Sequence, residues 1–138
     1  SSAASDVYKR QHLNIIMRQA ASTNGLTFAQ AQFLLQMPTE GIAISELAKH
    51  LGIDISTMSR NVNKLEALGL IYRKRSTHDS RTFNLFLSPA GDDLVDLLFA
   101  EIDTCTTAVL AKIPEELQHQ AGDLLEQLNW ALLQYHEN

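Results

Sequence analysis

The chain has 138 residues, of which 45% are hydrophobic, and its 16 acidic and 11 basic side chains give a formal net charge of −5. This length suits one domain with a modest core, and the composition is ordinary for a globular protein. No apolar run approaches the ~20 residues of a membrane span, and no secretory signal is evident. The single cysteine excludes an intrachain disulfide framework, so we expect a cytoplasmic protein with no membrane contact.

The first two predicted elements are helices. Residues 6–21 contain no glycine or proline and carry apolar side chains at helical spacing, while Tyr8 and Ile15 point away from that apolar face. Thr27 is placed to cap a second helix that continues to Met37. The stretch from Pro38 to Gly41 then interrupts the helical pattern.

The next two predicted helices are joined by a tight turn. The first covers about 44–51 and is followed by Gly52, a residue that commonly ends helices. Asp54 then stands where the N-cap of the second helix belongs, and Gly69 ends that helix. Its apolar stripe consists of Ile55, Met58, Val62, Leu65 and Leu68. Two short helices in this arrangement form a helix-turn-helix.

The outward arc of this second helix carries small, amide-bearing or cationic side chains. They are Ser56, Thr57, Arg60, Asn61, Asn63 and Lys64. Such a surface suits base edges and phosphates, with Arg60 almost opposite the apolar stripe. The alternative is an ordinary solvated face, which would be favoured if the polar helix stood alone.

A basic β-hairpin is predicted directly after the helix-turn-helix. Residues 70–75 are β-prone, 77–80 are turn-like, and 82–87 alternate, with Phe83, Leu85 and Leu87 on one face. The turn end carries Arg73, Lys74, Arg75, His78 and Arg81. Asp79 and Arg81 are two residues apart and can pair on one side of an extended chain. Between Lys49 and Arg81, seven basic against three acidic residues give +4, which leaves −9 for the remainder. A basic segment on an acidic body attracts phosphate locally.

Several of these stretches resemble the multiple-antibiotic-resistance repressor (MarR) family of winged-helix regulators. They are ISELAKHLGI, STMSRNVNKLEALGLI, the wing HDSR, and LFLSPAG before a long helix. The resemblance covers nearly the whole chain. It implies one mostly α (α+β) domain over 1–138, with a winged helix-turn-helix at 27–88 and dimerisation helices at 6–23 and 89–138. It also implies a third short strand at 41–43, a wing ordered by Asp79, and Arg81 in the minor groove.

The remaining chain is predicted to form two long helices. Ser88 and Pro89 open the first, which continues to about Lys112, and the second covers about 115–136. An apolar stripe on the last helix is expected to pack on the long helix before it; its members are Leu117, Ala121, Leu124, Leu125, Leu128, Leu132 and Tyr135. Trp130 and Leu133 project nearly opposite, so we expect them to form a dimer interface with Tyr8 and Ile15. The alternative is that Trp130 covers a loop of its own chain.

These elements predict a sequence-specific DNA-binding transcriptional regulator, a homodimer that represses from a pseudo-palindromic duplex site. We expect Arg60 to bind guanine and Asn61 and Asn63 to read adenine. Contacts to the DNA backbone are expected from Ser56, Thr57, Lys64, Arg73, Arg75 and His78. The resemblance implies release of DNA by a small aromatic or lipophilic effector. The alternative is a winged-helix module that binds another protein, as an antirepressor does.

No catalytic, cofactor or metal site is predicted. The chain has no nucleophile motif, phosphate-cradling loop or paired catalytic carboxylates, so we do not expect an enzyme. Glu115, Glu116 and His119 have ligand-like spacing without a cysteine partner. Cys105 falls on the apolar stripe of the long helix, where an inert buried thiol is favoured over a redox switch.

Overall fold

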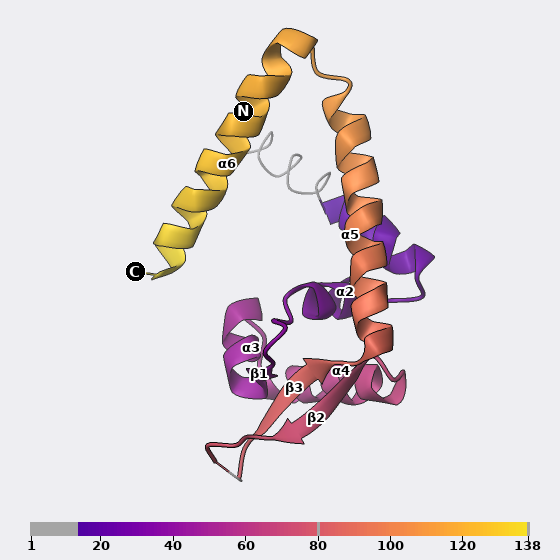
Figure 1. Ribbon diagram of the computed structural model, residues 1–138, viewed down its shortest axis with the longest axis vertical. Coiled ribbons are helices and arrows are strands. Elements are labelled where there is room, and N and C mark those ends of the chain that lie inside the picture. Colours follow the sequence, from indigo (N-terminus) through magenta and orange to yellow (C-terminus); the bar gives the residue numbers. More distant parts are fainter. Residues whose placement is uncertain (1–13, 80, 138) are drawn as a thin grey trace. The chain divides into compact units, whose positions relative to one another are not determined.

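The computed structural model describes residues 14–79 and 81–137 and divides into two compact units, residues 1–102 and 103–138. Figure 1 shows a helical chain with one small sheet. The first unit contains a helix at 14–23, α2 (Phe28–Leu35), β1 (Ile42–Ala43), α3 (Ile44–Leu51), α4 (Ile55–Ala67), β2 (Ile71–Arg75), β3 (Phe83–Leu87) and the start of α5 (Pro89–Leu110). The second contains the end of α5 and α6 (Glu115–Glu137). The predicted mostly helical fold with a small β wing is confirmed.

Local capping explains where the helices begin and end. Thr27 starts α2 through a capping box, because its hydroxyl accepts from the Gln30 amide at 3.1 Å and the Gln30 side chain accepts from the Thr27 amide at 3.0 Å. The expected ends at Met37 and Lys112 were each two residues too late. The amide of Met37 donates to the Leu34 carbonyl and that of Lys112 to the Val109 carbonyl, so both helices finish in a tighter turn.

The turn between α3 and α4 forms as the sequence predicts. Gly52 adopts a left-handed backbone with φ of 65°, which ends α3 at little steric cost. Asp54 caps α4, since its carboxylate accepts from the Thr57 amide at 3.0 Å and from the Thr57 hydroxyl at 2.7 Å. These two hydrogen bonds hold the pKa of Asp54 below its ordinary value, and the bond from the Thr57 hydroxyl has the larger effect.

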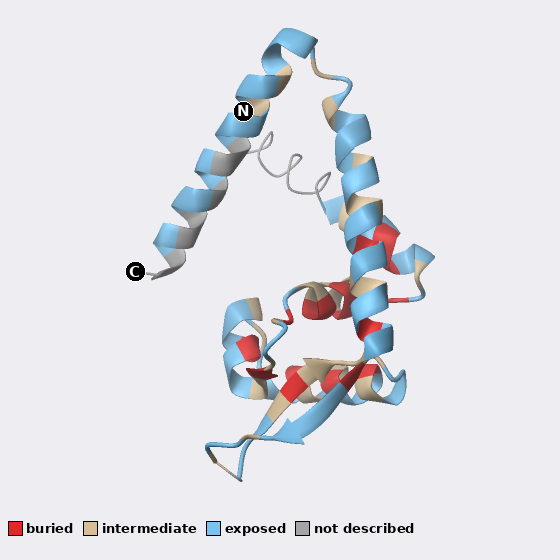
Figure 2. Ribbon diagram, viewed as in Figure 1, coloured by how far each residue is buried: buried red, intermediate tan, exposed pale blue. Residues whose placement is uncertain are grey.

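The core of the first unit lies where the helices meet the sheet. Figure 2 shows buried residues in α2, α4, the sheet and the first turns of α5. From α4 it takes Met58, Val62 and Leu65, all fully buried. Ile55 and Leu68 were predicted on the same stripe but are exposed, because they occupy the first turn and the C-cap of α4, beyond the reach of this core.

The wing is a three-stranded antiparallel sheet with the order β1-β3-β2. Ile42 pairs with Leu85, which confirms the short third strand. In the hairpin, Arg73 pairs with Leu85 and Arg75 with Phe83, so these residues alternate onto the same face. Leu85 is fully buried there, whereas Phe83 lies next to the hairpin loop and is exposed.

The sheet is joined to α5 by a close backbone contact. The Ser88 hydroxyl accepts from the Gly91 amide at 3.0 Å and donates to the Gly69 carbonyl at 2.6 Å, as the predicted N-cap should. The Ser88 amide donates to the Leu70 carbonyl at 3.0 Å. Gly91 is buried against that carbonyl, and a Cβ there would stand 2.0 Å from its oxygen. Only glycine fits at this position without movement.

The second unit leaves much apolar surface uncovered. The α6 stripe was expected to pack on the long helix, but Leu117, Leu124, Leu128 and Tyr135 are exposed. Cys105 was predicted to be buried but is partly exposed. It lies beyond Leu98, which is the last fully buried residue of α5. The side chains of Leu125, Leu132 and Leu133 lie outside the described residues, as does Tyr8. Among the helices that are described, none is long and apolar enough to span a membrane.

Candidate nucleic-acid interface

The outward face of α4 is polar and partly occupied by its own cap. Four of the six predicted contact residues are exposed, namely Ser56, Arg60, Asn63 and Lys64, and two are partly buried, Thr57 and Asn61. The Thr57 hydroxyl donates its hydrogen bond to the Asp54 carboxylate. While that bond holds, Thr57 offers only its backbone and its oxygen lone pairs to a partner. Spacing alone did not reveal this competition, although an Asp at the N-cap and a Thr three residues later are its signal.

The wing loop is built around Asp79. Its carboxylate accepts from the Arg81 amide at 3.0 Å and lies 3.3 Å from the Arg81 Nε, so the predicted pair is present. The pair closes a turn and does not lie along an extended strand. The Asp79 carbonyl accepts from the Thr82 amide and hydroxyl, both at 3.1 Å. The Arg81 side chain is 89% exposed, so the turn presents a positioned cation to the surroundings.

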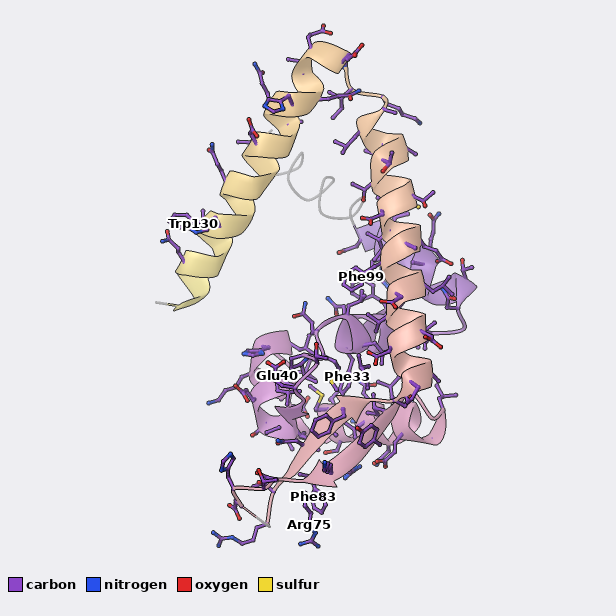
Figure 3. The ribbon with its side chains drawn as sticks, in the orientation of Figure 1. Phe33, Glu40, Arg75, Phe83, Phe99 and Trp130 are labelled. Carbon is purple, nitrogen blue, oxygen red and sulfur yellow. The ribbon has the colours of Figure 1, made fainter. Side chains whose placement is uncertain are left out.

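Two more predicted contact residues lie in the hairpin. The Arg75 guanidinium lies 5.3 Å from the centre of the Phe83 ring, and both residues are at the loop end of the strands (Figure 3). On the other face and farther from the loop, Tyr72 and Phe86 stack with ring centres 5.5 Å apart. His78 is exposed in the loop, where its amide donates to the Ser76 hydroxyl at 3.2 Å. The aromatic pairs stiffen a short hairpin that few core residues support.

Arg73 faces α4 and pairs with two of its side chains. Its Nη2 donates to the Asn63 Oδ1 at 2.6 Å, and its Nε lies 3.3 Å from the Glu66 Oε2. Two residues predicted to contact DNA separately are therefore bonded to one another. Sequence reasoning missed this bridge because the partners are ten residues apart and lie on different elements.

The predicted dimer residues lie on helices with uncovered apolar surface. Ile15 is exposed on the first helix, and Trp130 is 62% exposed on α6. The loop of the same chain that was considered as a cover for Trp130 does not bury it. Tyr8 and the Leu133 side chain fall outside the described residues.

Metal-ligating side chains do not gather in the part of the chain that is described. Over residues 14–79 and 81–137, no group of three His, Cys, Asp or Glu side chains could hold a metal ion. His119 was noted for its ligand-like spacing from Glu115 and Glu116. In the structure its Nε2 lies 3.5 Å from the Oδ2 of Asp123, one helical turn away.

Residues 24–82, which span α2 to the wing loop, match the model of the MarR family. Over this segment the chain resembles the MarR family. Among MarR-type relatives, it is 26% identical over 113 residues to the "HTH-type transcriptional repressor MdtR" of Bacillus subtilis, covering 81% of this chain and 73% of that protein. The crystal structure of YusO from Bacillus subtilis is 25% identical, covers 94% of this chain and 92% of its own, and superposes with a TM-score of 0.74.

The MarR fold extends over the flanking helices as well. MepR, "a transcription regulator of the Staphylococcus aureus multidrug efflux pump MepA", superposes with a TM-score of 0.80 at 21% identity, covering 96% of this chain and 98% of that chain. A second MepR structure is a complex with DNA, with a TM-score of 0.70 at 21% identity and coverage of 95% and 98%. These likenesses establish that the chain has the winged-helix fold of this family over nearly its whole length.

Proposed function

We propose that this protein is a sequence-specific DNA-binding transcriptional regulator of MarR type, acting as a repressor. The observation that carries the proposal is a capped helix α4 with a cationic and amide outward face, followed by a basic wing whose loop is ordered by Asp79. The family match supports it, as do a relative named a repressor and a relative crystallised with DNA.

The two elements would divide the reading of a duplex between them. In the proposal α4 enters the major groove, where Arg60 donates to guanine O6 and N7 while Asn61 contacts a neighbouring base. Ser56, Thr57 and Lys64 contact phosphates from the same helix. The wing reaches the flanking minor groove through Arg81, with Arg75 and His78 beside the backbone. Arg81 supports this role best, because its side chain is 89% exposed and its backbone amide is held by the Asp79 carboxylate.

Selection of binding sites from a random duplex pool tests the proposal. We expect a two-fold related sequence, since a symmetric dimer reads two half-sites. Arg60→Ala should cost on the order of 1–3 kcal/mol on that sequence and relax preference at one base pair per half-site. The matched control is Lys112→Ala, which also removes one exposed positive charge but lies outside the helix-turn-helix and wing. If no sequence is enriched and only a protein partner is captured, the protein-binding alternative takes the place of this proposal.

A homodimer built by the terminal helices is the second part of the proposal. Trp130, Leu128 and Tyr135 leave large apolar surfaces exposed on α6, and burying such side chains is worth about 1.5–3 kcal/mol each. A second copy that packs its own terminal helices there would cover them. It would also place two α4 helices about one DNA turn apart, roughly 34–36 Å.

A charge placed in the proposed interface tests the dimer. Trp130→Ala with Leu133→Asp should yield monomers in sedimentation and lose operator binding, because two half-sites can no longer be held together. Thr39→Asp adds the same charge at an exposed polar position outside the terminal helices and should remain dimeric. A double variant that sediments as a dimer and binds its site would remove this interface. Control of DNA release by a small aromatic or lipophilic effector is proposed from the family resemblance alone. Calorimetric titration with a panel of small aromatic compounds tests it.

A further inference from the structure

Arg73 occupies a central place between the wing and α4. It stands opposite Leu85 in the hairpin, on the face that turns toward the core. From there its Nη2 reaches the Asn63 Oδ1 at 2.6 Å and its Nε reaches the Glu66 Oε2 at 3.3 Å. Asn63 and Glu66 are three residues apart and therefore neighbours on one side of α4. A single planar guanidinium thus joins a wing strand to successive turns of the helix.

The chemistry of the three groups fixes the orientation of Asn63. A guanidinium only donates hydrogen bonds, so Asn63 has to present its carbonyl oxygen to Arg73. The amide NH2 group then points away from the bridge. Glu66 balances the positive charge of Arg73, and the two side chains are only 35% and 39% exposed. Partial burial strengthens the contact relative to one in open water.

We propose that Arg73 is a positioning residue that holds Asn63 with its NH2 group outward and ties the wing to α4, and that it does not neutralise a phosphate. The proposal rests on the proposed DNA-binding function of α4. Asn63 then meets the duplex as a donor, which suits guanine O6 and N7, thymine O4 or a phosphate oxygen. This role differs from the adenine contact expected of Asn63 and the backbone contact expected of Arg73.

Charge and geometry at position 73 can be separated by two substitutions. Arg73→Lys keeps the charge but cannot hold both partners with a fork, and Arg73→Gln removes the charge as well. We expect each to weaken operator binding by about fivefold for each half-site, the equivalent of one ordinary hydrogen bond per subunit. Both should leave the slope of log K against log salt unchanged. Lys64→Gln is the control, because it removes one phosphate contact from each half-site and should lower that slope by about 1.8, or about 0.9 for each contact.

The opposite pattern would overturn the proposal. If Arg73 contacts a phosphate, Arg73→Lys binds like the wild type and Arg73→Gln lowers the slope as Lys64→Gln does. A double variant adds a second criterion. Asn63→Ala should cost little more in the Arg73→Lys background, because the amide has already lost its fixed orientation. Independent losses that multiply would show that Asn63 works without Arg73.

A measurement without DNA separates this proposal from the proposed function. In the nuclear magnetic resonance spectrum of the free protein, the Asn63 side-chain amide should give one shifted pair of proton signals, and the Arg73 Nε–H should give one shifted signal. Arg73→Lys should return the Asn63 amide to the position of a solvent-exposed asparagine. If these signals are already those of exposed side chains in the wild type, the bridge is absent and the proposal is overturned. If the bridge is present but no duplex binds, the proposed function is wrong and Arg73 keeps only its structural contact.

Discussion

Gly91 should be the position where the smallest substitution does the most damage. A Cβ added there stands 2.0 Å from the Leu70 carbonyl oxygen, so α5 and Leu70 would have to separate by at least 1.0 Å to reach even the 3.0 Å limit of observed contacts. The obstacle is backbone and cannot rotate aside. Overpacking of this kind costs about 1–3 kcal/mol. The shift would also break the bonds from Ser88 to Leu70 and Gly69, worth about 1 kcal/mol each.

Against these losses, alanine favours a helix over glycine by about 1 kcal/mol. We therefore expect Gly91→Ala to lower the free energy of unfolding by roughly 2–4 kcal/mol. Urea denaturation followed by circular dichroism, at one fixed protein concentration, measures it. Gly122→Ala is the matched control, since Gly122 lies in α6 with nothing within 4 Å of its added Cβ. That control should stabilise by about 0.5–1 kcal/mol. A Gly91→Ala protein as stable as Gly122→Ala would refute the close contact between α5 and the wing sheet.

The remaining predictions concern the cap and the wing. Because its pKa is lower in the folded than in the unfolded chain, Asp54 stabilises the fold above its ordinary pKa, and this stabilisation is lost as pH falls through the lowered pKa. Denaturation midpoints of wild type and Asp54→Ala should thus converge between about pH 5 and pH 2; a gap that stays constant would contradict the cap. Arg81→Ala should weaken most the sites with narrow flanking minor grooves, by about 1–3 kcal/mol. Asp79→Ala should weaken the same sites, and the losses of the two should not add, which a double-mutant cycle on one duplex panel measures.

Features controlled by neighbouring residues could be predicted from the sequence. Thr27, Gly52, Asp54 and Ser88 act within a few residues of themselves, so each cap and stop was predicted where the structure has it. The hairpin and its Asp79 turn belong to the same class, since their hydrogen bonds also span only a few residues.

Features that depend on distant contacts could not be predicted. Periodicity placed Ile55 and Leu68 on the apolar side of α4 but gave no measure of where the core ends. It likewise identified the apolar stripe of α6 without identifying what covers it. The bridge from Arg73 to Asn63 and Glu66 requires the register of the hairpin against α4, which no local pattern contains.

In the proposed function, α4 and the wing bind duplex DNA through its phosphates. The most direct test is the affinity for a selected duplex measured across a range of salt concentrations. If roughly six to ten phosphates are neutralised per dimer, log K should fall linearly with log salt by about 0.9 for each of them. The segment from Lys49 to Arg81 supplies the charge, with seven basic residues against three acidic. An affinity that stays flat between low and physiological salt would contradict binding of α4 and the wing to phosphates.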